Sequence, residues 1–220
     1  RKLGIWVRDN LQGLGTITFL TRDSRFGALG HGIHDVDTNG LVEIAKGSLY
    51  ATNIRTLMKG RAGMPGSLEG IIVYNSFNRL GEIEKNTEAG IYGKLEKVDR
   101  LFEEEIAIEV AKKEEICTGP AQIRCCIGDE ICYYDVEILD VDLTEKEVNK
   151  GMIVRVTDPK LLEETGGIIQ GMSGSPIVQN GKLIGAVTHV FVNHPEKGYG
   201  IFAETMLEFS GENFAENQTE

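Results

Sequence analysis

A serine lies in a stretch of small residues that suits nucleophilic catalysis. Residues 171–176 read Gly-Met-Ser-Gly-Ser-Pro and lead into the apolar pair Ile177-Val178. A serine hydroxyl becomes a good nucleophile only when a neighbouring base takes its proton, and the oxyanion that it forms needs preplaced hydrogen-bond donors. A turn rich in glycine can aim backbone N–H groups at one point, so we expect those of Gly171 and Ser173 to form an oxyanion hole. Ser173 is therefore the candidate nucleophile.

The candidate base is a histidine flanked by glycines, far from this serine in the sequence. His31 lies between Gly30 and Gly32, after a run of residues typical of a strand. Glycine on both sides allows the backbone to approach other groups closely. Because this is a costly place for a histidine with a structural role only, we expect His31 to act as the general base. His34 is its close competitor.

The elements that must position these residues are short strands. β-branched and aromatic segments alternate with turn residues every eight to twelve positions, which is typical of a sandwich or barrel. The expected strands cover residues 3–8, 15–20, 26–33, 41–44, 47–57, 71–74, 81–83, 91–95, 105–111, 121–124, 131–139, 152–156, 177–178, 182–192 and 199–203. We find no internal repeat and no low-complexity linker.

One short helix is expected directly before the nucleophile loop. Asp158-Pro159 supplies an N-cap and a first helical residue, and Gly166-Gly167 supplies a stop. After Ser173, the pair Asn180-Gly181 between two apolar runs predicts a hairpin. Ser173 is therefore expected at the entrance of a β-hairpin. The acidic, polar tail of residues 208–220 is expected to fray.

The composition disfavours several classes of function. The chain has 220 residues, enough for one large β domain or two small barrels that share a core. Its 34 acidic and 23 basic side chains give a formal net charge of −11, which repels phosphate backbones, so nucleic acid is not an expected partner. No apolar run approaches the roughly 20 residues of a membrane span. No metal site and no cofactor are expected.

Four cysteines gather in one stretch of the chain, and the sequence assigns them no function. Cys117, Cys125, Cys126 and Cys132 are not spaced like the ligands of a tetrahedral zinc site. Disulfides and packed free thiols are both open readings. A cysteine-based activity around Cys125 and Cys126 is a weaker hypothesis, because no histidine lies near them in the sequence.

These motifs resemble those of chymotrypsin-like serine peptidases and, over nearly the whole chain, the peptidase domain of the stage IV sporulation protein B family. The closer resemblance rests on residues 3–9, 13–16, 27–31, 165–176 and 185–193. It implies an all-β, chymotrypsin-like double β-barrel over residues 1–207, with the active site between the two halves.

The resemblance also implies roles for individual residues. Ser173 becomes the nucleophile, His31 the general base and Asp158 the acidic partner. An extended substrate would be added as a strand beside Thr188, His189 and Val190.

The acidic partner is the open point of this assignment. An N-capping carboxylate is by itself a complete explanation of the Asp158-Pro159 pair. If Asp158 is only a cap, the carboxylates to consider are Asp35, Asp37 and Glu82.

Other hydroxyl and imidazole groups are weaker candidates. The pattern G-x-S-G-x-P aligns Ser173 with the reactive position, and Ser175 stands where glycine is common. We expect His189 to be a strand residue near the substrate and His194 a turn residue before Pro195, although their spacing would also allow a role as base.

The family implies a secreted, membrane-associated serine endopeptidase that is made in the forespore of endospore-forming bacteria. It is expected to act in the space between forespore and mother cell, where it cleaves the regulator of an intramembrane protease and also cleaves itself. The chain begins at Arg1, and a PDZ domain and a membrane anchor are expected upstream, the anchor being its only link to the membrane. The alternative reading is a catalytically silent module that binds peptides by strand addition.

Overall fold

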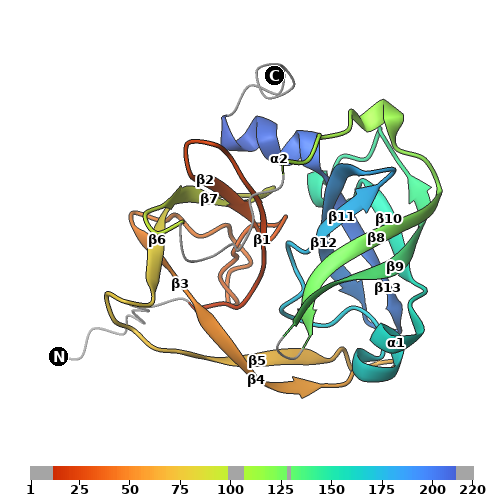
Figure 1. Cartoon of the computed structure of the whole chain (residues 1–220), viewed down its shortest axis with the longest axis horizontal. Coiled ribbons are helices and arrows are strands. Elements are labelled where there is room, and N and C mark those ends of the chain that lie inside the picture. Colours follow the sequence, from red (N-terminus) through yellow and green to blue (C-terminus); the bar gives the residue numbers. More distant parts are fainter. Residues whose placement is uncertain (1–11, 99–106, 128–129, 212–220) are drawn as a thin grey trace.

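The fold is known from a computed structural model, which describes residues 12–98, 107–127 and 130–211. About half of the described chain is β-strand, arranged in two halves, with two α-helices and two short 3-10 helices, Lys113–Glu115 and Val148–Lys150 (Figure 1). The prediction of an all-β fold with a short helix before the nucleophile loop is confirmed. The expected strand at residues 3–8 lies outside the described residues.

The N-terminal half is a five-stranded antiparallel sheet with strand order β1-β2-β7-β6-β3. Its strands are β1 (Ile17–Leu20), β2 (Arg25–Ala28), β3 (Gly47–Tyr50), β6 (Arg79–Thr87) and β7 (Gly90–Leu95). The buried centre of the sheet is formed by Phe26, Ala28, Ile91 and Leu95. This sheet carries the glycine-flanked histidine just beyond the end of β2.

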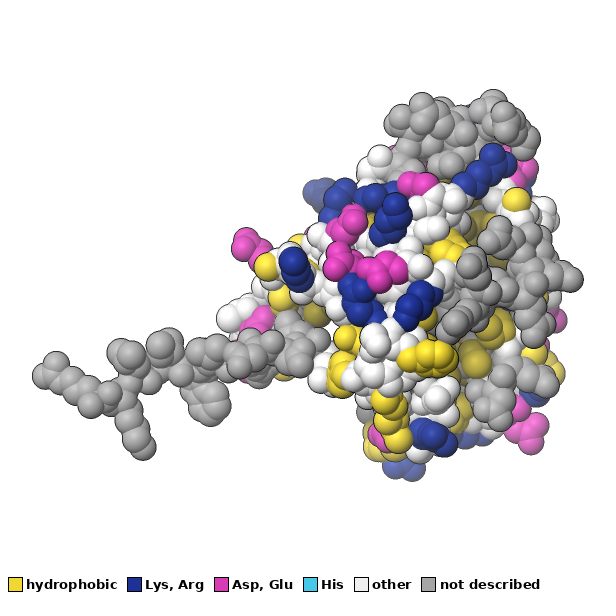
Figure 2. Space-filling model, turned by 60° about the vertical axis from the view of Figure 1, so that its left-hand side comes forward, with side chains coloured by type: hydrophobic (Ala, Val, Ile, Leu, Met, Phe, Trp, Pro, Cys, Tyr) yellow, Lys and Arg dark blue, Asp and Glu magenta, His cyan; other side chains and the backbone are white. Residues whose placement is uncertain are grey.

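The outer side of this half carries mixed charge. Arg25 pairs with Glu84 at 2.9 Å, and Arg79 pairs with Glu96 at 2.6 Å. Figure 2 shows acidic and basic side chains intermingled on this side of the molecule. The net negative charge is therefore not gathered into a single acidic patch on this face.

A two-stranded ribbon connects the two halves. It consists of β4 (Thr52–Met58) and β5 (Ser67–Ile72), and Figure 1 shows it running from the N-terminal sheet towards α1. The N–H of Gly60 donates to the Thr165 carbonyl and the N–H of Leu68 donates to the Gln170 carbonyl, both at 2.8 Å. The ribbon thus holds the segment that leads to Ser173.

The C-terminal half is a closed barrel with strand order β10-β13-β12-β11-β8-β9. Its strands are β8 (Gly119–Ile127), β9 (Glu130–Val141), β10 (Met152–Val156), β11 (Pro176–Gln179), β12 (Lys182–Phe191) and β13 (His194–Phe202). The largest buried cluster of the protein fills it, with Ile123, Val154 and Ile177 all 0% exposed. Closure of the barrel leaves the Ser173 turn at its rim, before β11.

The helices differ in how well the sequence predicts them. The helix α1 (Pro159–Thr165) was expected, and it ends at Gly166 with a φ of 75°. The second helix, α2 (Ala203–Ser210), was not expected, and it corrects the expected frayed tail for residues 208–210. Its Met206 packs with Ala186 and Ile201. No helix in the described part of the chain is long and apolar enough to span a membrane.

Two expected strands are wrong. Leu41 forms only an isolated bridge with His34, and Val110 forms only one with Leu183. The residues around them, 41–44 and 107–111, otherwise run as loops. The structure shows all four cysteines as free thiols, of which Cys125 is buried and Cys117 is exposed.

Candidate active site

The turn around Ser173 is held by bonds within itself and from the other half of the protein. Within the turn, the Ser175 N–H donates to the Met172 carbonyl at 2.9 Å. From the N-terminal half, the Thr16 N–H donates to the Ser173 carbonyl at 2.9 Å, and the Thr18 hydroxyl donates to the Gly174 carbonyl at 2.8 Å. These bonds fix the serine at the junction of the two halves.

Two backbone donors of this turn have no protein acceptor among the described residues: the N–H groups of Gly171 and Ser173. The neighbouring N–H groups of Met172 and Gly174 are bonded to the carbonyls of Ile169 and Val187. Gly171 has a φ of 102°, which an L side chain rarely adopts. The expected pair of oxyanion donors is therefore free to bind a ligand.

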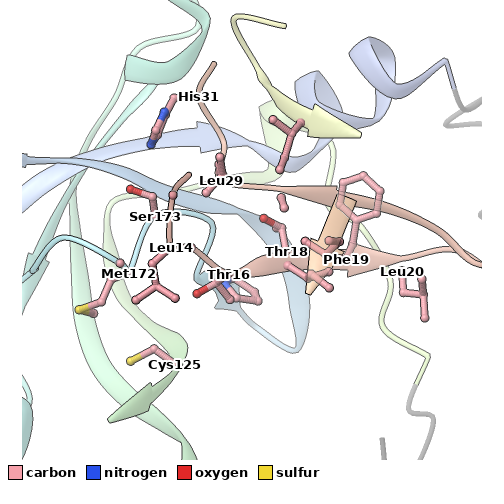
Figure 3. A pocket seen from close by; sticks show the side chains of 18 of the residues that line it. Leu14, Thr16, Thr18, Phe19, Leu20, Leu29, His31, Cys125, Met172 and Ser173 are labelled. Atoms are coloured by element: carbon pink, nitrogen blue, oxygen red, sulfur yellow. The ribbon is translucent and has the colours of Figure 1, made fainter. Parts of the chain in front are cut away.

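The histidine loop is pressed against the serine's barrel. A Cβ on Gly30 would lie 2.9 Å from Ile201 and 3.0 Å from Thr188, so only glycine allows this approach. His31 and Ser173 both line a pocket between the halves. Figure 3 shows the His31 ring directly beside the Ser173 side chain. The structure thus brings together the two residues that the sequence singled out.

The surroundings of His31 suit a neutral base. Its Nδ1 lies 3.0 Å from the Gly32 carbonyl. Burial lowers the pKa of His31, while the bond to Gly32 acts in the opposite direction and the charge of His34 lowers the pKa further. Because a carbonyl can only accept, Nδ1 carries the proton in this contact and Nε2 keeps its lone pair.

The expected substrate edge lies next to both residues. The Ser173 hydroxyl donates to the Thr188 carbonyl at 2.9 Å, and the His189 ring lies 4.7 Å from the His31 ring between centroids. Val190 pairs with Gly198 of β13. On its other side β12 pairs with β11 only as far as Ala186, so among the described strands the backbone of residues 188–190 has an open edge.

His189 is strongly disfavoured as a cation. Loss of hydration, together with the charges of His31 and Lys150, lowers the pKa of His189 to about 4. His189 is nevertheless an exposed residue. At neutral pH both rings of the His31–His189 pair are therefore uncharged, and His189 presents an apolar face to His31.

The structure shows Asp158 as the helix N-cap that the sequence also allowed. The Asp158 carboxylate accepts from the Leu161 N–H at 3.0 Å as the N-cap of α1, and it also lies 3.4 Å from the Asp135 N–H. Both contacts belong to the C-terminal barrel and its helix. Asp158 is a cap in this structure, and the Nδ1 of His31 faces the Gly32 carbonyl instead.

Asp35 and Glu82, two of the three alternative carboxylates, are engaged in other contacts. Asp35 accepts from the N–H groups of Asp37 and Thr38 at 3.1 and 2.9 Å, which makes it the first residue of a polar turn. Glu82 pairs with Arg79 at 2.9 Å on the outer side of β6. None of these three contacts involves His31.

The remaining candidate nucleophiles and bases are unsuited to catalysis at this site. Ser175 is 0% exposed, and its hydroxyl has no partner in the described part of the chain. His194 contacts Glu196 at 3.3 Å on the surface. Burial raises the pKa of Cys125 to about 12, which disfavours the thiolate that a cysteine nucleophile needs. The described residues contain no cluster of ligands that would hold a metal.

The chain is similar to known peptidases. The family model described as "SpoIVB peptidase S55" matches residues 1–207. No curated protein matches the chain significantly. Among solved structures, the Rv3671c protease from M. tuberculosis in its active form is 14% identical with a TM-score of 0.42, covering 69% of this chain and 66% of that chain. The inactive form of the same protease is also 14% identical, with a TM-score of 0.40 and coverages of 67% and 73%. This chain thus spans slightly less than two thirds of the length of the active-form structure.

Proposed function

Because this chain belongs to the SpoIVB peptidase S55 family and is a serine peptidase, we propose that it cleaves proteins through an acyl-enzyme formed on Ser173, with His31 as general base. One observation carries these roles. Two residues that lie 142 positions apart in the sequence are neighbours in one pocket between the halves, beside two free backbone donors.

The reaction begins with a rotation of the nucleophile. The Ser173 hydroxyl leaves the Thr188 carbonyl and turns to the Nε2 of His31, which takes its proton as Oγ attacks the scissile carbonyl. The N–H groups of Gly171 and Ser173 bind the oxyanion, and His31 then gives the proton to the leaving amine. A water molecule, deprotonated by His31 in the same way, releases the acyl group.

The substrate is a peptide in extended conformation. Its backbone adds to the open edge of residues 188–190, which brings the scissile bond to the Ser173 turn. A hydrogen bond fixes the side chain of Thr188, because its hydroxyl donates to the Asn149 carbonyl at 2.7 Å. The edge is thus a fixed template for the incoming strand.

We infer the biological substrate from the resemblance to this family, which supports it. The protein is an extracytoplasmic peptidase of sporulation signalling that cleaves a membrane-associated regulator of an intramembrane protease, and itself, between forespore and mother cell. An upstream PDZ domain and membrane anchor bring it to this substrate. Incubating the Ser173→Ala chain as substrate with wild-type enzyme tests self-cleavage, and an intact substrate chain would count against that part of the proposal.

A silent peptide-binding module is the second candidate, favoured by the resting contact of Ser173 with Thr188 and by the carbonyl partner of His31. Hydrolysis of an unstructured protein such as casein separates the two. We expect cleavage by the wild type and none by Ser173→Ala. Equal hydrolysis by both would overturn the role of Ser173, and binding without hydrolysis by the wild type would support the module.

A further inference from the structure

A peptide bound as proposed above places one residue between the Ser173 turn and the open edge of β12. This is the acyl residue, whose carbonyl Ser173 attacks. Its carbonyl oxygen meets the N–H groups of Gly171 and Ser173. Its backbone lies beside Thr188, whose carbonyl is 2.9 Å from the Ser173 hydroxyl. The side chain of the acyl residue therefore enters the space between residues 168–171 and residues 188–190.

An isoleucine from the segment before Ser173 occupies this space. Ile168 lines the pocket between the halves and is 2% exposed. A Cβ on Gly198 would lie 2.8 Å from the Cδ1 of Ile168, so only glycine at this position allows the isoleucine to approach β13 so closely. The side chain of Ile168 thus reaches from the nucleophile segment across to β13.

A valine of β12 narrows the same space from the other side. Val190 is paired with Gly198 in the antiparallel ladder of β12 and β13. Because residues directly opposite each other in such a pair project to the same face, Val190 points to the face on which Ile168 covers Gly198. Val190 packs against the buried cluster that contains Ile168, and both residues line the pocket. Two branched apolar side chains therefore limit the room left for the acyl residue.

Backbone bonds hold the segment that carries Ile168 on two sides. The Ile168 N–H donates to the Pro195 carbonyl of β13 at 2.7 Å. The Gln170 N–H donates to the Gly66 carbonyl at 2.9 Å, and the Gln170 carbonyl accepts from Leu68 of the β4–β5 ribbon at 2.8 Å. Moving Ile168 aside would break these bonds in a well-packed region, so the segment does not readily yield to a larger side chain.

We propose that Ile168 and Val190 restrict the acyl residue to a small side chain, such as that of glycine, alanine or serine. The proposal deepens the proposed function and rests on the role given there to Ser173. A branched or aromatic side chain would overlap the atoms of Ile168, and a close-packed site accommodates extra carbon atoms poorly. A charged side chain would lose hydration against two apolar residues that offer it no partner. The substrates are thus proteins with a small residue directly before the cleaved bond.

Peptidyl diphenyl phosphonates that carry alanine, leucine or phenylalanine at the acyl position test the proposal. Each reagent labels the reactive serine at a rate that depends on how well its side chain fits. We expect the alanine reagent to label the wild-type chain at least about tenfold faster than the leucine reagent, since one methylene group alone changes selectivity in an apolar pocket by roughly tenfold or more. The phenylalanine reagent should be slower still. Fastest labelling by the leucine or phenylalanine reagent would overturn the proposal.

Substitution of Ile168 should change this preference. Ile168→Val removes only Cδ1, the atom that lies against Gly198, and Ile168→Ala removes more of the side chain. We expect the ratio of the alanine rate to the leucine rate to fall by roughly tenfold in Ile168→Ala and by less in Ile168→Val. Because the readout is a ratio of two rates on one preparation, a partly unfolded fraction does not alter it.

Ile138→Val and Ile138→Ala are the matched controls. Ile138 is 1% exposed and belongs to the same buried cluster, but it lies on β9 and does not line the pocket. Both controls should keep the wild-type ratio. An unchanged ratio in Ile168→Val and Ile168→Ala, or an equal fall in the controls, would overturn this proposal alone. A wild-type chain that resists labelling by a small fluorophosphonate would overturn the proposed function itself, and this proposal with it.

Discussion

The Ser173 hydroxyl donates its hydrogen bond to the Thr188 carbonyl, 2.9 Å away, and not to His31. Ser173, Thr188 and His31 all line the pocket between the two halves, and we expect a change of the Ser173 side-chain rotamer to turn the hydroxyl towards His31. Thr188 belongs to the edge that we assign to the substrate. We expect a peptide that binds there to compete for this carbonyl and so to free the serine for its base.

Ser175→Ala should leave activity intact and not reduce stability. The hydroxyl of Ser175 is buried without a partner among the described residues, and its removal ends a desolvation cost of about 1 kcal/mol. Urea unfolding should give an equal or higher midpoint than the wild type, with equal peptide hydrolysis. Loss of hydrolysis in this variant would mean that the reactive serine has been misassigned.

Asp158→Asn and Asp158→Ala separate a cap from a catalytic acid. Asn caps a helix nearly as well as Asp, whereas Ala loses about 1 kcal/mol of stability at such a position. We therefore expect Asp158→Asn to resemble the wild type in both stability and kcat. We expect Asp158→Ala to lose stability and to keep the wild-type kcat. Thermal unfolding and peptide hydrolysis measure the two effects. A fall in kcat of several orders of magnitude in Asp158→Asn would restore the triad with Asp158.

Gly171→Ala should lower kcat by about a hundredfold or more, because it disturbs a donor of the oxyanion hole. The new Cβ would lie 3.0 Å from the Leu68 Cβ, at a φ of 102° that Ala adopts poorly. Gly119→Ala is the control: its φ is 123°, its Cβ would meet nothing within 4 Å, and it lies on β8. It should lose stability without losing kcat. Equal kcat values for the two variants would argue against the oxyanion role.

His189 should make the protein less stable in mild acid. Its pKa is about 4 in the folded chain, below the ordinary value of about 6.5 that it regains on unfolding. Between these values the unfolded chain binds more protons, so stability falls as pH falls from about 6.5 towards 4. Replacing His189 with Gln should reduce the difference in urea midpoint between pH 7 and pH 5. An unchanged difference would show that the ring is not held neutral.

The sequence points to Ser173 and His31 because both carry local signatures, a turn of small residues and a pair of flanking glycines. It leaves the acid open because Asp158-Pro159 satisfies a helix start and a catalytic motif equally well. The contact of the histidine loop with the end of β6 has no local signature. This contact depends on β7 pairing with β2, which is a property of strand order.

The fold shows the same division between local and long-range information. α1 has a capping residue and a glycine stop, and it was predicted. α2 follows β13 directly, with Phe202 at its N-cap and no side-chain cap bond. No capping residue in the sequence therefore predicts where this helix begins. The expected strand at 41–44 fails because Leu41, 37% exposed, has only the His34 bridge as a partner.

The most direct test of the Ser173–His31 pair is to locate a fluorophosphonate adduct by mass spectrometry after proteolytic digestion. We predict one adduct in the wild-type chain, on the peptide that contains Ser173, and almost none in His31→Ala at the same reagent concentration and time. An adduct on another residue, or labelling of His31→Ala at the wild-type rate, would contradict the assignment of nucleophile and base.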